Sequence, residues 1–141
     1  MYQKRDRDLK RLGFECYTDY LRSPLWDVIR REVIKRDFAE CAVVDCLSER
    51  GVRQVHHLSY TLSVLLGLKT SQLVTVCQFC HERLEFSKHG YRLSPRSKQR
   101  RNLRLLKSKR EGVEYFVSRS ILRRVIPSTT EYDILLVQGR E

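Results

Sequence analysis

Residues 41–85 read CAVVDCLSERGVRQVHHLSYTLSVLLGLKTSQLVTVCQFCHERLE, and four cysteines in this segment give the clearest indication of the fold. They form two pairs, Cys41 with Cys46 and Cys77 with Cys80, separated by 30 residues. Short spacing within each pair is typical of zinc sites, because a tight loop turns two thiolates towards one ion. Buried apolar cysteines are the alternative. The pattern favours a structural Zn²⁺ on all four thiolates, with no coordination position left for a substrate.

The fifth cysteine, Cys16, has no partner at such a spacing and is expected to pack as a small hydrophobic residue. The N-terminus lacks the apolar segment of a secretory signal, and no apolar run reaches the roughly 20 residues that span a bilayer. We therefore expect an intracellular, cytoplasmic protein that does not cross a membrane. Disulfides are disfavoured in that compartment, which strengthens the interpretation of the cysteines as metal ligands.

The charge balance points to a polyanionic partner. The 141 residues include 28 Lys and Arg against 17 acids, a net charge of +11. Nucleic acid is the usual partner of such an excess, although a membrane surface would also satisfy it. The length suits one domain with extensions.

Histidines lie between and directly after the cysteine pairs. His56 and His57 are adjacent, and His81 follows Cys80 with Glu85 four residues later. Positions i and i+4 share one helix face, so His81 and Glu85 could grasp one cation, with His56 as a third ligand. Open coordination positions would remain, and a neutral His57 could accept a proton from water. Histidines that only pack, and a solvated Glu85, are the alternative.

The run YLRSPLWDVIRREVIKRD, followed by the cysteine pairs, QVHHLSY and LVTVCQFCHERLEF, resembles the HNH nucleases over residues 14–89. The resemblance implies a ββα-metal core, similar to a treble clef, that cleaves DNA phosphodiester bonds. In that family a hairpin carries the first catalytic histidine, a loop carries an asparagine and a helix carries the last ligand. In many members, two zinc-binding cysteine pairs also stabilise this motif.

Transferred residue by residue, the resemblance makes His57 the general base. It makes His56, His81 and Glu85 ligands of a catalytic divalent metal, Mg²⁺ or Mn²⁺ first, with Zn²⁺ or Ni²⁺ also accepted. Gln72 stands where the family has its asparagine, and its amide would orient His57. The alternative function is a non-catalytic zinc-containing module that keeps the scaffold and binds DNA or RNA.

The expected fold class is α+β in three parts: an N-terminal helical arm (1–40), the zinc-stapled core (41–90) and a basic C-terminal extension (91–141). We predict helices over 17–21, 24–37 and 79–90, and a short helix or apolar loop over 61–68. A strand in 41–46 should pair in a hairpin with 52–60 across the turn between them. Residues 1–13 are expected to be frayed, and a last helix and strand are expected over 113–124 and 132–138.

The segment 92–110 holds nine Lys or Arg and no acid. A solvated helix face is the ordinary explanation. Beside a nuclease core, however, we favour an extension that clamps DNA. Double-stranded DNA is the expected partner, in preference to RNA. Leu103, Leu105 and Leu106 should anchor it to the core. The residues expected to contact nucleic acid are Arg96, Lys98, Arg100, Arg101, Arg104, Lys107, Lys109 and Arg110.

Overall fold

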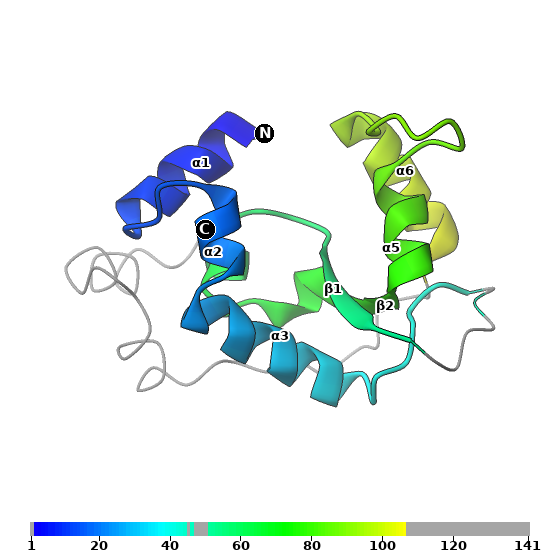
Figure 1. Cartoon of the computed structure of the whole chain (residues 1–141), viewed down its shortest axis with the longest axis horizontal. Helices are drawn as coiled ribbons and strands as arrows, with labels where there is room; N and C mark the ends of the chain where they lie inside the picture. The colour runs from blue at the N-terminus through cyan, green and yellow to red at the C-terminus, as the bar shows by residue number, and fades with distance from the viewer. Residues whose placement is uncertain (1, 45, 47–50, 107–141) are drawn as a thin grey trace.

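A two-stranded antiparallel sheet lies between two groups of helices in the computed structural model, which describes residues 2–44, 46 and 51–106 (Figure 1). Strand β1 (Arg53–His57) pairs with β2 (Leu73–Cys77), with His56 opposite Val74. The expected α+β class is therefore confirmed. None of the helices among the described residues is long and apolar enough to cross a membrane.

The helices divide into an N-terminal group and a C-terminal group. The first comprises α1 (Tyr2–Arg11), α2 (Tyr17–Leu21) and α3 (Pro24–Arg36), of which α3 packs on the sheet. The second comprises α5 (Gln78–Glu85) and α6 (Pro95–Leu105), which lie on the other side of the sheet in Figure 1. The connection between the strands contains α4 (Leu62–Leu65) and the short 3₁₀ helix η1 (Thr70–Gln72).

Helix α3 follows the sequence prediction closely. The Ser23 side chain accepts a hydrogen bond from the Trp26 backbone N–H, and Pro24 occupies the first turn, where its missing N–H costs nothing. Leu25, Ile29 and Val33 are buried at helical spacing, so one face of α3 enters the core. The predicted helix at Tyr17–Leu21 is confirmed as well.

Residues 1–13 are not frayed as expected: Tyr2–Arg11 form α1. The sequence there is strongly charged, but Leu9 and Leu12 are fully buried in the main core, and Phe14 is 5% exposed. Burial of two leucines stabilises by about 3–6 kcal/mol, enough to hold a short helix that would be marginal alone. Cys16, expected to pack, is instead exposed.

The predicted hairpin between 41–46 and 52–60 is wrong, because the partner of β1 is β2. Val43 forms only an isolated bridge with Leu106, and the Ala42 N–H donates to the Thr75 carbonyl. The segment must turn to bring Cys41 and Cys46 together, so it cannot stay extended. The β-branched residues of β2 form the regular strand instead.

The C-terminal helices also differ from the prediction. Helix α5 ends at Glu85 rather than near Gly90, since Phe86 is extended and bridges to Arg92. Leu105 and Leu106 pack against the cysteine-containing cluster as expected, but Leu103 is 80% exposed and does not belong to that cluster. The predicted elements at 113–124 and 132–138 lie outside the described residues, as do Lys107, Lys109 and Arg110.

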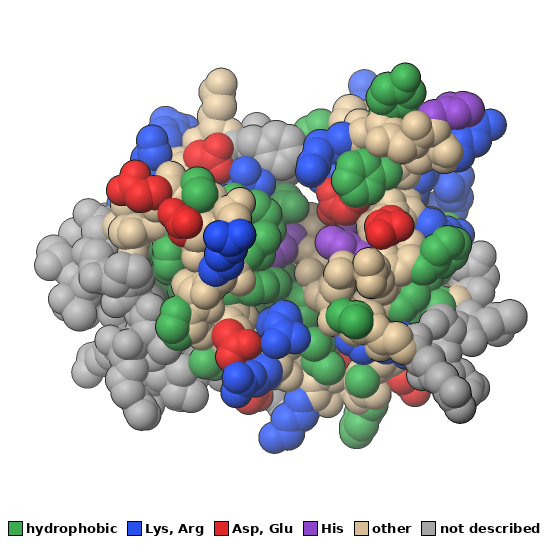
Figure 2. Space-filling model, in the orientation of Figure 1, with side chains coloured by type: hydrophobic (Ala, Val, Ile, Leu, Met, Phe, Trp, Pro, Cys, Tyr) green, Lys and Arg blue, Asp and Glu red, His purple; other side chains and the backbone are tan. Residues whose placement is uncertain are grey.

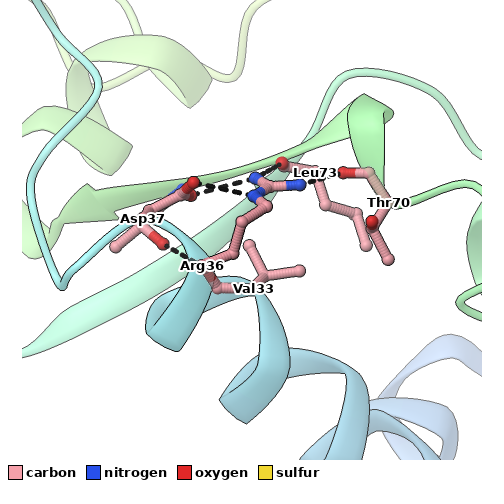
Figure 3. A network of polar contacts seen from close by, with 6 residues as sticks. Val33, Arg36, Asp37, Thr70 and Leu73 are labelled. Atoms are coloured by element: carbon pink, nitrogen blue, oxygen red, sulfur yellow. Dashed lines mark hydrogen bonds and ion pairs between the residues drawn. The ribbon is translucent and has the colours of Figure 1, made fainter. Parts of the chain in front are cut away.

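A network at the end of α3 holds β2 in place (Figure 3). The Arg36 guanidinium donates to the carbonyl oxygens of Thr70 (2.7 Å) and Leu73 (2.6 Å) and pairs with Asp37. Asp37 also accepts the backbone N–H of Thr75 at 3.0 Å. This ion pair therefore satisfies backbone groups on the edge of β2 that faces away from β1.

We expect Asp37→Ala to lower the free energy of unfolding by about 3 kcal/mol, because it leaves Arg36 as a buried, unpaired cation. Arg36 and Asp37 side chains are only 9% and 15% exposed. The matched control is Asp27→Ala on the same helix, whose pair with Arg31 is 40% and 71% exposed and should be worth less than about 1 kcal/mol. Urea unfolding measures both, and equal losses would contradict a structural role for the Arg36 network.

Candidate metal sites

The four cysteines predicted to bind zinc converge at one end of the sheet. Cys41 and Cys46 come from the loop after α3, Cys77 ends β2, and Cys80 lies in the first turn of α5. Their sulfur atoms all lie within 4.8 Å of one another. The Cys80 backbone N–H points at the Cys77 sulfur at 3.4 Å. The cluster could hold a structural metal such as zinc.

The chemistry of the cluster fits a metal better than four free thiols. Burial raises the pKa of both Cys41 and Cys80. Burial also acts to raise the pKa of Cys77, but hydrogen bonds from Cys80 and the other thiols outweigh it and lower that pKa. Four thiolates this close would repel one another, and a divalent cation removes that repulsion. Val43, Val76 and Leu84 surround the sulfurs, which favours a structural site over a catalytic one.

A second cluster joins β1 to α5. His56 Nδ1 lies 3.4 Å from Glu85 Oε1, and His81 Nε2 lies 3.9 Å from the same oxygen. The three ligand atoms fall within 4.8 Å of one another. His56 is 1% exposed, and its Nδ1 has no hydrogen-bond partner among the described residues. Such an unpaired buried nitrogen is costly unless something else satisfies it, and a metal ion would.

The charges around this second cluster suit a cation. Burial acts to raise the pKa of Glu85, but the adjacent His56 and Lys98 outweigh it and lower the pKa to about 2. Glu85 is therefore ionised at neutral pH. Burial and the proximity of His56 lower the pKa of His81, so its imidazole is neutral. A neutral imidazole and an ionised carboxylate are the forms that bind metals.

Lys98 occupies a different place from the one expected of a nucleic-acid contact. Its side chain is 8% exposed, and its Nζ lies 2.5 Å from Glu85 Oε2. Arg101 also makes intramolecular contacts, since it donates hydrogen bonds to the carbonyl oxygens of Arg83 and Phe86. These two cations dock α6 onto α5. Arg96, Arg100 and Arg104 are exposed.

His57 points to the other side of the sheet and is enclosed by aromatic rings. It stacks between Trp26 and Tyr60, with ring centroids 4.7 and 5.0 Å away. Its Nδ1 lies 3.3 Å from the Tyr17 hydroxyl, and its buried Nε2 has no hydrogen-bond partner in the described part of the chain. Burial, followed by the proximity of His56 and His81, lowers its pKa to about 3, so the ring is neutral at pH 7.

Gln72 does not orient His57 in the described structure. It ends η1, directly before β2, and its backbone carbonyl accepts the Leu58 N–H at 2.8 Å. No hydrogen bond joins its side chain to His57 within residues 51–106, and the Tyr17 hydroxyl takes the position expected of an orienting group. The backbone of Gln72 thus extends the strand pairing.

A cavity of about 1140 Å³ lies between the N-terminal helices and the α5–α6 pair. His57, His81 and Glu85 all line it, and Figure 2 shows histidine side chains at the bottom of this hollow. Cations lie along its walls on both sides, among them Lys10 and Arg30 on one and Arg92 on the other. The cavity can therefore receive an anionic group next to the second cluster.

Sequence reasoning missed several residues of this region. Asn102 Oδ1 lies 2.9 Å from His56 Nε2, and Tyr17, Trp26 and Tyr60 surround His57. The only signal for Asn102 was an uncharged amide four residues after Lys98 in an otherwise cationic segment, which places both on one helix face. The aromatic residues gave no signal, since such residues usually form core.

Comparison with known proteins identified no relative of this chain. The chain matches no protein-family model, no curated protein and no solved structure. The likeness to HNH nucleases therefore rests on the residues quoted above, and membership of that family stays a prediction.

We expect purified protein to hold one zinc ion tightly on the thiol cluster, and Cys77→Ser to lose both the ion and cooperative unfolding, since zinc binding supplies folding free energy. Elemental analysis by mass spectrometry and thermal melting measure the two effects. Cys16→Ser is the matched control, because Cys16 is exposed and outside the cluster. A Cys77→Ser protein with unchanged zinc and melting would rule out the site.

Proposed function

We propose that the protein is a divalent-metal-dependent endonuclease that hydrolyses DNA phosphodiester bonds. The observation that carries this proposal is the convergence of His56, His81 and Glu85 beside a cavity with basic walls. His57 lines the same cavity. The order of these residues on strand and helix agrees with the resemblance to HNH nucleases.

The second cluster supplies the ligands of the catalytic metal. His56 Nδ1, His81 Nε2 and Glu85 Oε1 are the three atoms in position to hold it. Three protein ligands leave coordination positions open for a phosphate oxygen and water. When bound, a divalent ion polarises the phosphate and stabilises the leaving oxygen. A set of two imidazoles and one carboxylate accepts Mg²⁺, Mn²⁺, Ni²⁺ or Zn²⁺.

His57 is the proposed general base. Its lowered pKa keeps the ring neutral, so it can take a proton from the attacking water. The Tyr17 hydroxyl at Nδ1 and the flanking Trp26 and Tyr60 rings restrict its orientation. A base held in one orientation avoids the entropic cost of positioning it at the moment of reaction.

The substrate is proposed to be DNA, with double-stranded DNA preferred over RNA. The net charge of +11 and the cations on both walls of the cavity favour a polyanion over a neutral ligand. Arg96, Arg100 and Arg104 are exposed on α6 and could add phosphate contacts outside the cavity, whereas Lys98 and Arg101 are occupied within the protein.

A non-catalytic zinc-containing module that binds DNA or RNA is the second candidate. One observation favours it: His57 is only 6% exposed, and its Nε2 is enclosed although no partner among the described residues satisfies it. Enclosure of that nitrogen would keep water from it and make His57 a packing residue. Cleavage assays on the histidine variants separate the two candidates.

We predict that His57→Ala keeps metal and DNA binding but lowers the cleavage rate by roughly 10²–10⁴, the usual contribution of a general base. His81→Ala should lose cleavage through weaker binding of the catalytic metal, so excess metal should partly restore it. The measurement is nicking of supercoiled plasmid with Mg²⁺ or Mn²⁺, before and after chelation.

His89→Ala is the control, because His89 is exposed on the turn after α5. This variant should cleave DNA at the wild-type rate. Neither catalytic variant should release the structural zinc, which has separate ligands. If the wild-type protein binds DNA but does not cleave it with any divalent metal tested, the nuclease proposal is rejected and the binding module remains.

DNA affinity should fall steeply with salt, because each phosphate that a cation neutralises releases counterions from the DNA. Replacing Lys10, Arg30 and Arg92 by Gln should make the slope shallower by about 0.9 for each phosphate that is no longer neutralised. These three cations lie on the walls of the cavity. Fluorescence anisotropy between about 50 and 200 mM salt measures the slope.

The control for this variant replaces Arg31, Lys35 and Lys69 by Gln. It removes the same charge from exposed positions that do not line the cavity. Equal slopes for the two triple variants would show that DNA binds elsewhere.

A further inference from the structure

Helix α6 contributes directly to the arrangement of the proposed metal site. We propose that Asn102 is a positioning residue that sets the tautomer of His56 and thereby presents His56 Nδ1 as a metal ligand. The inference rests on the proposed function, because it concerns the same site. It is independent of the resemblance to HNH nucleases, which covers residues 14–89 and does not reach Asn102.

The hydrogen bond determines which nitrogen of His56 is free. Asn102 Oδ1, an acceptor, lies 2.9 Å from His56 Nε2, so Nε2 carries the proton and donates it. A neutral imidazole has one N–H and one bare nitrogen, so Nδ1 then keeps its lone pair. Nδ1 lies 3.4 Å from Glu85 Oε1 on the side of the second cluster. Without the acceptor, the proton could move to Nδ1 and donate to Glu85, which would block the ligand.

Asn102 is held firmly because α6 is fixed along its length. Lys98, Arg101, Asn102 and Leu105 share one helix face, at i, i+3, i+4 and i+7. Lys98 pairs with Glu85 Oε2, which leaves Oε1 towards the histidines, and Arg101 ties α6 to the end of α5. At the C-terminal end, Leu105 packs on the thiol cluster and its carbonyl accepts the Val44 N–H at 2.9 Å.

The same contacts connect the two metal sites. Leu105 and Leu106 pack against the cluster that contains Cys41, Cys77 and Cys80. One helical turn earlier, Asn102 reaches His56. The thiol cluster thus supports the helix that positions a ligand of the second site. Groups that hydrogen-bond to a metal-binding histidine typically change metal affinity by about 10–100-fold when removed.

The test measures metal affinity rather than cleavage. Protein with zinc on the thiol cluster is titrated with Mn²⁺, and free Mn²⁺ is followed by electron paramagnetic resonance. Asn102→Leu removes the acceptor at similar volume and should weaken Mn²⁺ binding by about 10–100-fold. Asn102→Asp keeps an acceptor oxygen and should rescue the affinity. Gln99→Leu is the matched control: it removes an exposed amide from the same helix and should change nothing.

A second measurement tests the proposal even if Asn102→Leu fails to fold. Nitrogen-15 shifts of His56, recorded before Mn²⁺ is added, should show the proton on Nε2 in the wild type. A proton on Nδ1 would overturn the proposal, as would an Asn102→Leu protein that folds and binds Mn²⁺ as tightly as the wild type. Those results leave the metal site intact, whereas a wild type that binds no Mn²⁺ overturns the site and the inference together.

Discussion

Four cysteine thiols meet at one end of the small sheet and tie distant parts of the chain together. This cluster joins the loop after α3, the end of β2 and the start of α5 at one point. A two-stranded sheet is marginal in water by itself, and a metal at this cluster would contribute the missing free energy of folding. Leu105 and Leu106 pack against the same cluster, so it also supports α6, which carries Asn102 beside His56.

The geometry of β1 explains why two adjacent histidines have different surroundings. Successive side chains of a strand point to opposite faces, so His56 and His57 are separated by the sheet itself. His56 meets Glu85, His81 and Asn102, all from α5 and α6. His57 meets Tyr17, Trp26 and Tyr60, two of which belong to the N-terminal helices. The pair therefore joins the two helical groups across a strand only five residues long.

Electrostatics at the second cluster balance burial against pairing. Burial disfavours a charged Glu85, but His56 and Lys98 keep the carboxylate ionised by holding its pKa low. Burial keeps His57 and His81 neutral by lowering the pKa of each. One carboxylate with uncharged imidazoles is the combination that binds a divalent cation, and strongly shifted pKa values of this kind gather at functional sites. Within the described residues, the unpaired Nδ1 of His56 and Nε2 of His57 add a cost that packing alone does not explain.

Features that depend on short spacing could be predicted from the sequence alone. These features are the cysteine pairs, the position of His81 and Glu85 on one helix, and the capped helix that begins at Pro24. Each follows from residues within a few positions of one another. Long-range packing sets the pairing of β1 with β2, the helix at Tyr2–Arg11 and the partners of the histidines. Tyr17 lies 40 residues from His57, and Asn102 lies 46 from His56. Such contacts arise only when the whole core packs, because no local periodicity encodes which distant side chain a buried polar atom will meet.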